Sequence, residues 1–246
     1  MKFANLFFMI TLKNIEFISK NSIKHIQNLI KDILEFDLNL PRYFIQIGAG
    51  AGDLDRRANY RDGFSEVVKN LQLQESDRVV LIEPNPLNIE KLKLSWKNSK
   101  NVDIYPIGIS TGDSFTTQKL YYAEQDAPHY QTASIVSEHI LKHYKNLTLE
   151  NLKYFEITTI NLNDVINIFV RKNPIILLAI DIEGIDSEVI LSTDFSKFNT
   201  VLISFEYIHM GPQLEKIKQH FEDCGYEHIG FGLDPNCFDY LYMKRF

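Results

Sequence analysis

A short apolar run followed by three alternate glycines, from Tyr43 to Gly52, constrains the fold of this chain more than any other stretch. The run at 43–47 is typical of a strand that is buried on both faces. Gly48, Gly50 and Gly52 let the backbone turn with positive φ and approach a ligand closer than any side chain permits. In an α/β protein this loop is the usual cradle for a nucleotide. A plain strand-to-helix turn, the alternative interpretation, needs fewer glycines.

Strand-like and helix-like segments alternate along the rest of the chain and predict an α/β fold. The alternation favours a doubly wound, mostly parallel sheet with helices on both faces. No helical pattern separates the last two strand-like runs, so we expect them to form an antiparallel hairpin at the sheet edge. The expected strands are residues 43–47, 78–82, 102–107, 115–122, 154–160, 174–180, 201–205, 226–230 and 238–243, and the expected helices are 65–73, 87–98, 135–144, 162–170, 187–191 and 213–224.

Residues 15–36 place isoleucine and leucine near helical spacing and predict an N-terminal helical extension. Asn21-Ser22 divides this segment, so one long helix and two short ones both fit the pattern. We expect the extension, residues 1–40, to precede a single α/β domain over residues 41–246. Two roles stay open for it. One is a helical lid or packing layer before the sheet, and the other is a helix that binds a membrane surface or pairs with a second copy in a homo-oligomer.

Composition narrows the partners and the compartment. The 246 residues are 45% apolar and 24% charged, which suits one domain with a full core. A net charge of −6 and the lack of a basic stripe argue against nucleic acid. Two cysteines, Cys224 and Cys237, are too few for a disulfide framework. No apolar run approaches the ~20 residues that cross a bilayer, and residues 4–10 lack a small-residue cleavage site, so we expect no membrane span and a cytoplasmic protein.

Two nucleotide cofactors compete for the glycine loop. A dinucleotide site has its third glycine three residues after the second, where this chain has Asp53, and an acid roughly 20 residues further on. Here the acid that ends the second strand is Glu83, which lies 83 − 48 = 35 residues after the first glycine. The alternate glycines suit a ligand without a pyrophosphate. We therefore expect S-adenosylmethionine, with its methionine part along the loop and its ribose hydroxyls on Glu83.

Three motifs resemble the successive motifs of FkbM-type methyltransferases. They are Ile45-Gln46-Ile47-Gly48-Ala49-Gly50-Ala51-Gly52, then Glu83-Pro84-Asn85-Pro86, then Asp181-Ile182-Glu183-Gly184-Ile185-Asp186. The resemblance covers about residues 43–209. It implies a class I methyltransferase fold of the Rossmann type over residues 41–246. It also implies S-adenosylmethionine as cofactor and, usually, O-methylation of sugar or polyketide hydroxyls.

The resemblance and the loop together give a set of expected cofactor-binding residues. Ile107-Gly108 resembles the family's small-residue turn near the adenine, and Thr132-Ala133-Ser134 resembles a segment that borders the active site. Two departures stand out: Gln46 occupies a position where the family commonly has an acid, and an insertion over residues 53–62 delays the first helix. The expected cofactor-binding residues are Gln46, Gly48, Ala49, Gly50, Gly52, Asp53, Glu83, Pro84, Asn85, Ile107, Gly108 and Asp181.

Methyl transfer is an in-line displacement on a sulfonium, so catalysis requires the acceptor oxygen and the methyl carbon to be aligned. A sugar hydroxyl is a poor nucleophile near neutral pH, and a positioned base helps it. We expect Asp181 to orient or deprotonate the acceptor, with His209 or Glu206 assisting. Glu183 and Glu206 have an alternative interpretation as caps of helices or loop amides. The same side chains have the oxygen and nitrogen ligands of a divalent cation, but their spacing does not demand one, and we expect no metal.

Further polar residues are candidates for contacts with the acceptor. Arg56, Arg57 and Arg61 are candidates for a phosphate clamp, but three aspartates in the same loop favour a self-paired, solvated segment. The acceptor is expected to be a carbohydrate, a nucleotide sugar or a glycan precursor. N-methylation of a small molecule or peptide, and binding of the cofactor without turnover, are the alternatives. Candidates for contacts to the acceptor are His129, His139, His143, Tyr121, Tyr122 and Tyr130.

Overall fold

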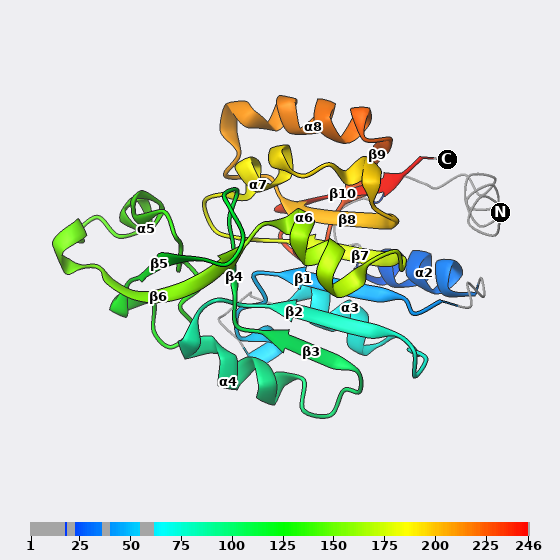
Figure 1. The fold of residues 1–246 in the computed structure, drawn as a ribbon, viewed down its shortest axis with the longest axis horizontal. Helices are drawn as coiled ribbons and strands as arrows, with labels where there is room; N and C mark the ends of the chain where they lie inside the picture. The colour runs from blue at the N-terminus through cyan, green and yellow to red at the C-terminus, as the bar shows by residue number, and fades with distance from the viewer. Residues whose placement is uncertain (1–17, 19–22, 36–39, 55–61, 246) are drawn as a thin grey trace.

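The computed structural model describes Ile18 and residues 23–35, 40–54 and 62–245. A seven-stranded sheet runs through the centre in the order β3-β2-β1-β7-β8-β10-β9 (Figure 1). All neighbouring strands are parallel except β10, which runs antiparallel to β8 and β9 and so forms the predicted hairpin with β9. The strands are β1 (Tyr43–Ile47), β2 (Arg78–Ile82), β3 (Val102–Tyr105), β7 (Ile175–Ile180), β8 (Thr200–Glu206), β9 (Tyr226–Phe231) and β10 (Asp239–Lys244).

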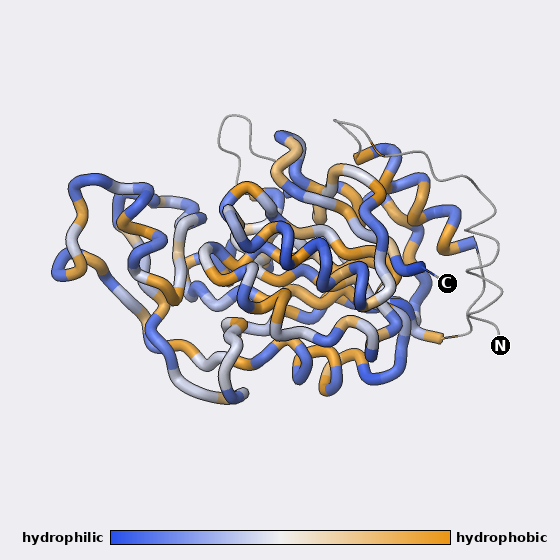
Figure 2. The backbone as a smooth tube through the Cα atoms, turned by 90° about the horizontal axis from the view of Figure 1, so that it is seen from above, coloured by the Kyte–Doolittle hydropathy of each residue, from blue (hydrophilic) through white to orange (hydrophobic). Residues whose placement is uncertain are grey.

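Helices cover both faces of this sheet, as the alternating pattern predicts. Alternate residues of β1 are buried on opposite sides: Phe44 packs in one hydrophobic core and Ile45 in the other. The first core also contains residues of α2, α3 and α4, and the second contains residues of α6, α7 and α8. Figure 2 shows the apolar strands enclosed between helices with hydrophilic outer residues. The helices are α2 (Ile23–Leu34), α3 (Gly63–Lys69), α4 (Pro86–Ser95), α5 (Ser137–His143), α6 (Leu162–Val165), α7 (Asp186–Ser192) and α8 (Leu214–Asp223).

A second sheet of three strands stands apart from the main one, which the sequence did not predict. It consists of β4 (Gly108–Ile109), β6 (Lys153–Ile160) and β5 (Thr116–Tyr122), in that order. The single strand expected over residues 102–107 is wrong at its end: β3 stops at Tyr105, and the chain enters the second sheet at Gly108. Figure 1 shows this sheet and α5 projecting beyond the main sheet. Ile140 of α5 is fully buried in a small separate core, which it forms with Ala123 and Leu152.

Two helices differ from their expected form. α3 begins at Gly63 and not at residue 65. The predicted helix 162–170 is α-helical only in α6 and continues as a π-helical turn over Ile166–Val170. The turn ends on a hydrogen bond of 2.8 Å from Arg171 N to Ile166 O, and Arg171 then takes a φ of 61°. The wider turn buries Ile166 and Val170 in the second core and leaves Ile168 exposed.

The N-terminal segment packs against the rest of the protein. Ile26, Ile30 and Ile33 of α2 are at most 1% exposed and belong to the first core. Ile18 pairs with Gly230 at the edge strand β9. This arrangement is the packing layer that helical spacing allowed for residues 15–36, although residues 1–17 and 19–22 lie outside the described residues. Across the described part of the chain, no helix is both long and apolar enough to cross a membrane.

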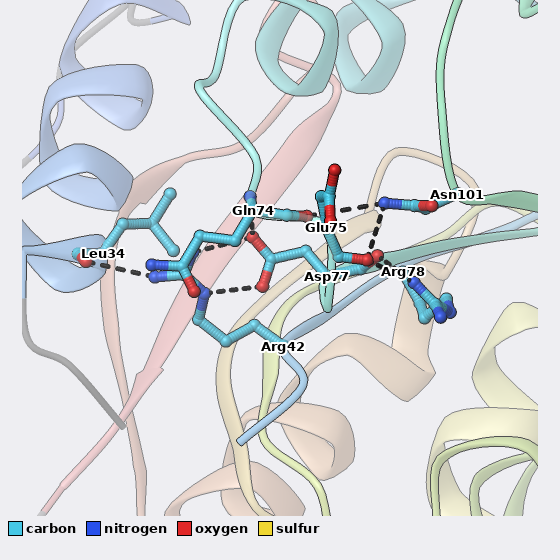
Figure 3. Close-up of polar contacts among 7 residues, drawn as sticks. All are labelled: Leu34, Arg42, Gln74, Glu75, Asp77, Arg78 and Asn101. Carbon is cyan, nitrogen blue, oxygen red and sulfur yellow. Dashed lines mark hydrogen bonds and ion pairs between the residues drawn. The ribbon is translucent and has the colours of Figure 1, made fainter. Parts of the chain in front are cut away.

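A buried ion pair joins α2 to the amino ends of β1 and β2 (Figure 3). The Arg42 guanidinium donates to both carboxylate oxygens of Asp77, at 2.8 and 2.7 Å, and a further nitrogen donates to the carbonyl of Leu34 at 3.1 Å. Arg42 is 4% exposed and Asp77 is 0% exposed. Asp77 also accepts from the Gln74 amide. Because both charges have several partners, this pair fixes the end of the sheet opposite to the site described next.

Candidate active site

A cavity of about 250 Å³ lies at the carboxyl ends of the parallel strands. It sits where the strand order changes direction, between β1 and β7, which is the usual ligand site of a doubly wound sheet. Residues from the glycine loop, the start of α3, both central strands, the second sheet and the terminal hairpin all contribute to its wall. The polar and glycine residues among those lining it are Gln46, Gly48, Gly50, Asp62, Gly63, Glu83, Asn88, Gly108, Tyr130, Gln131, Asp181, Glu183, Glu206, Asp234, Asn236 and Asp239.

The glycine loop forms one wall, and its first glycine is required by a backbone contact. Gly48 has a φ of 76°, and its amide donates to Ile82 O at 2.9 Å. A Cβ at this position would lie 1.6 Å from the carbonyl oxygen of Asp181. The amide of Asp181 in turn donates to Ile47 O at 3.1 Å. The carboxyl ends of β1, β2 and β7 are therefore held in direct backbone contact at the cavity.

Glu83, at the end of β2, holds the middle of the glycine loop. One carboxylate oxygen accepts from the Gly50 amide at 2.7 Å, and the other accepts from the Asn85 amide at 2.9 Å. Asn85 itself caps α4 by accepting from the Leu87 amide at 3.0 Å. Burial raises the pKa of Glu83 to about 7, although hydrogen bonds from the Asn85 and Gly50 backbone amides and from the Asn88 side chain oppose the shift. A carboxylate has about four acceptor positions, so one is left for a ribose hydroxyl.

Unsatisfied acceptors in the wall fit a ligand that carries N–H or O–H donors. The side-chain oxygens of Gln46 and Asn88 are buried and have no hydrogen-bond partner in the structure. Both side chains line the cavity, together with the Glu83 carboxylate. A nucleoside with an amino-acid side arm supplies hydroxyl, amine and ammonium donors. The residues present therefore fit S-adenosylmethionine, and no phosphate is needed to account for them.

The opposite part of the wall is strongly acidic. Asp181 follows β7, Glu206 ends β8, and Asp239 begins β10, whose first residue pairs with Glu206. Asp181 lines the cavity, and its accessible surface opens into this enclosed space. Desolvation by the surrounding protein, with Glu183 and Glu206 next in effect, raises the pKa of Asp181 well above its usual value. Burial likewise raises the pKa of Glu183 to about 8 and that of Glu206 to about 9.

Two of these carboxyl groups contact histidines. The ring Nε2 of His139 lies 2.9 Å from a Glu183 oxygen, and that of His209 lies 3.8 Å from a Glu206 oxygen. Burial lowers the pKa of both histidines. Because the pKa values of the acids are raised and those of the imidazoles are lowered, each Glu–His pair carries one titratable proton at neutral pH and has no net charge. Gly184 allows the first contact, because a Cβ there would lie 2.9 Å from the His139 ring.

His139, His143 and His209 form a cluster of rings whose centroids are 4.8 to 6.2 Å apart. Among the described residues, however, no group of three or more His, Cys, Asp or Glu side chains is arranged to hold a metal ion. His139 comes from α5, beyond the second sheet, and the Ser134 hydroxyl donates to the backbone of Glu183 at 2.5 Å. The segment after β5 therefore forms one side of the acidic end.

The structure brings together only part of the site predicted from the sequence. Gln46, Gly48, Gly50, Glu83, Pro84, Gly108, Asp181 and Glu206 line the cavity. Ala49, Gly52, Asn85, Ile107 and His209 are not among the lining residues, and neither is Asp53. Asp53 forms an ion pair with Lys69 at 2.9 Å and accepts from the Ser95 hydroxyl, which ties the loop to α3 and α4. Arg56, Arg57 and Arg61 lie outside the described residues.

Six polar residues of the wall are not among the residues predicted from the sequence: Asp62, Asn88, Gln131, Asp234, Asn236 and Asp239. Asp62 and Asn88 come from helix starts, where a sequence pattern predicts caps and not ligands. Asp234 and Asp239 come from the terminal hairpin. Asp239 could have been predicted from the expected hairpin. A strand that runs antiparallel to its neighbour starts beside the carboxyl end of that neighbour, which is where the cavity lies.

The raised acid pKa values predict how stability depends on pH. Glu83, Asp239, Glu183 and Glu206 have folded-state pKa values of about 7, 7, 8 and 9, all above their usual values. At these four groups the folded protein binds more protons than the unfolded chain between about pH 4.5 and 9, so the stability that they contribute falls as pH rises through this window. We expect the melting temperature of the cofactor-free protein to decrease from pH 5 to pH 9, with a shallower decrease above pH 7 in Glu206→Gln. A flat profile in the wild type would contradict the assignment, and Glu188→Gln, on an exposed residue of α7, is the control.

Several solved structures match this chain at low sequence identity. The METTL16 methyltransferase domain is 11% identical with a TM-score of 0.47, and the match covers 92% of this chain and 67% of that one. A Legionella pneumophila protein is 13% identical with a TM-score of 0.47, covering 94% and 86%. Aeropyrum pernix fibrillarin, solved with natively bound S-adenosyl-L-methionine, is 11% identical with a TM-score of 0.40, covering 91% and 75%. A search of curated protein sequences found no significant match.

The family assignment comes from a sequence model. The model of the methyltransferase FkbM domain matches residues 46–228, which is well over half of the 246 residues. The match contains the glycine loop, Glu83 and the motif that starts at Asp181, and it agrees with the strand order and with the position of the cavity. The chain therefore belongs to the FkbM methyltransferase family and is an S-adenosylmethionine-dependent methyltransferase.

Proposed function

We propose that the protein methylates a hydroxyl of a carbohydrate or glycan precursor. The observation that carries this proposal is the position of Asp181. Its backbone packs against Gly48 of the glycine loop, and the residue lines the acidic end of the same cavity. A base at that point lies between the cofactor's cradle and the space left for an acceptor. When bound, S-adenosylmethionine supplies an activated methyl group on a sulfonium, which needs no further activation by the protein.

The chain's own residues have separate tasks in this proposal. The glycine loop and Gln46 would hold the methionine arm of the cofactor, and Glu83 would bind its ribose. Asp181 accepts the proton of the acceptor hydroxyl and orients its oxygen. Glu206 contacts His209, and Glu183 contacts His139. In this proposal both carboxyl groups are protonated at neutral pH, so neither adds a second negative charge beside Asp181. The sulfonium charge of the bound cofactor would lower the pKa of Asp181 and so favour its basic form.

The wall favours a neutral acceptor over a phosphorylated one. Within the described residues, those that line the cavity include no lysine, arginine or histidine. A diphosphate beside Asp181, Glu206 and Asp239 would meet only negative or neutral groups. Tyr130 and Phe238 line the cavity and offer aromatic faces to the apolar side of a sugar ring. A neutral sugar hydroxyl therefore fits better than a nucleotide sugar.

The same acidic wall supports a second candidate, methylation of an amine. A protonated amine would be attracted to the carboxylates, and one of them would then remove the proton that blocks the nitrogen lone pair. N-methylation of a small molecule or peptide is therefore the runner-up. A cytoplasmic location and a homo-oligomeric state stay predictions from the sequence.

A panel assay tests these proposals. We expect calorimetry to show binding of S-adenosylmethionine and no binding of NADH. We then expect S-adenosylhomocysteine to form only when an acceptor is present, and faster with neutral glycosides than with nucleotide sugars or amines. Faster transfer to amines would replace the leading proposal by the second one. Binding without turnover on every acceptor of the panel would favour a non-catalytic role.

A further inference from the structure

A buried carboxylate in the cavity wall has no part in the function described so far. Asp62 precedes α3, is 6% exposed and lines the same cavity as Gly48 and Asp181. It accepts hydrogen bonds from the Gln46 amide nitrogen, at 3.1 Å, and from the Ser65 hydroxyl. No described residue forms an ion pair with it. The charge of Lys69 acts on Asp62, but Lys69 itself is paired with Asp53 and bonded to Ser95.

Gln46 adds a second unsatisfied group at the same place. A carboxylate only accepts hydrogen bonds, so the amide nitrogen of Gln46 must face Asp62, and this fixes the position of the amide oxygen. That oxygen is buried and has no donor. Gln46 as a whole is 8% exposed, and it lines the cavity at the end of β1. The pair therefore presents one negative charge and one neutral acceptor, and it lacks donors.

The chemistry that satisfies both groups is a cation with several N–H donors. A sulfonium has positive charge but no N–H, and ribose hydroxyls have donors but no charge. A primary ammonium has both, since it carries three N–H donors. Burial raises the pKa of Asp62, and a neighbouring ammonium would lower it again by favouring the charged form.

We propose that Asp62 and Gln46 form the binding site for the α-ammonium group of S-adenosylmethionine, with Asp62 supplying the charge. The proposal deepens the cofactor-dependent function above and rests on it. It also explains how a strand that ends with a neutral Gln46 can serve this cofactor: the negative charge comes from the loop before α3, across a hydrogen bond of 3.1 Å.

Binding measurements test the proposal without turnover. We expect Asp62→Asn to weaken binding of S-adenosylhomocysteine about 10- to 100-fold, the usual effect of losing a hydrogen bond to a charged group. Binding of 5′-methylthioadenosine, which lacks the amino-acid arm, should change less than about twofold. Adding Gln46→Glu to Asp62→Asn should restore most of the affinity for S-adenosylhomocysteine, because the charge returns to the adjacent side chain. Asp103→Asn, on an exposed residue of β3, is the matched control.

The ligand series also works on the unchanged protein. Wild type should bind a desamino analogue of S-adenosylhomocysteine as weakly as Asp62→Asn binds S-adenosylhomocysteine itself. Equal affinity of Asp62→Asn and wild type for S-adenosylhomocysteine would overturn the proposal, and so would an equal loss for 5′-methylthioadenosine or a double variant without recovery. Failure of the wild type to bind any of the three ligands would instead overturn the proposed function. If Asp62→Asn does not fold, Asp62→Ser and the desamino comparison give the same decision.

Discussion

Asp181→Asn is expected to lower the rate of methyl transfer about 100- to 10,000-fold, the usual contribution of a positioned base. The amide keeps the size and hydrogen-bonding shape of the carboxylate, but it accepts no proton at neutral pH. Affinity for S-adenosylhomocysteine should stay within about twofold, because the backbone contacts of residue 181 with Gly48 and Ile47 do not involve its side chain. Single-turnover kinetics and calorimetry on the same preparation measure the two quantities separately.

The control for this experiment is Glu188→Gln, which removes a carboxylate from an exposed position of α7 in the same segment of chain. Its turnover should match that of the wild type. Glu206→Gln should have a smaller effect than Asp181→Asn, because in the proposed mechanism Glu206 assists Asp181 and does not itself take the proton of the acceptor. Unchanged turnover in Asp181→Asn would remove this residue from the mechanism and leave Glu183 as the next candidate.

Gly48→Ala is expected to abolish cofactor binding and to destabilise the protein. The new Cβ would lie 1.6 Å from the Asp181 carbonyl oxygen and 2.8 Å from its carbon, and neither backbone atom can rotate away. β1 and β7 would have to separate at the cavity, which displaces the glycine loop and Asp181 together. We expect a loss of at least about 2 kcal/mol in unfolding free energy. That corresponds to a decrease of roughly 4–8 °C in melting temperature.

Gly50→Ala separates the clash from the backbone strain. Gly50 also has a positive φ, of 54°, but a Cβ there would meet no atom within 4 Å. This variant shares the cost of a left-handed residue, about 1–2 kcal/mol, without the contact. It should fold and keep measurable affinity for S-adenosylhomocysteine. Equal behaviour of the two variants in melting and calorimetry would show that close packing of the strand ends is not why Gly48 is a glycine.

The main sheet could be predicted from the sequence because its signals are local. Continuous apolar runs such as Ile175–Ile180 predict fully buried strands, and the absence of a helix before Asp239 predicts the hairpin. The second sheet could not be predicted in the same way. β4 is two residues long and pairs with β6 about 50 residues later, so its existence depends on a contact that no local pattern records. The boundary error after Tyr105 follows from this.

The site divides along the same line. Glu83 and two glycines of the loop, Gly48 and Gly50, could be predicted at the cavity because each lies in a recognisable motif directly after a strand. Asp62 and Asp239 were not predicted, because tertiary packing decides which side chains face the cavity. Gly63 illustrates the point: a Cβ there would lie 1.9 Å from the carbonyl of Leu233, so the hairpin loop sets the position of the α3 start. Asp53, expected among the cofactor-binding residues, is bonded to Ser95 and Lys69 and is not among the residues that line the cavity.

The buried pair of Arg42 and Asp77 restricts how the protein can be shortened. A chain cut just before Arg42 would keep every cavity residue but lose α2, and with it the Leu34 carbonyl that shields the guanidinium. Water and solvent ions would then reach a buried ion pair. Loss of the α2 isoleucines would also expose the apolar surface of the first core against which they pack. Trimmed versions for crystallisation or directed evolution should therefore begin ahead of Ile23.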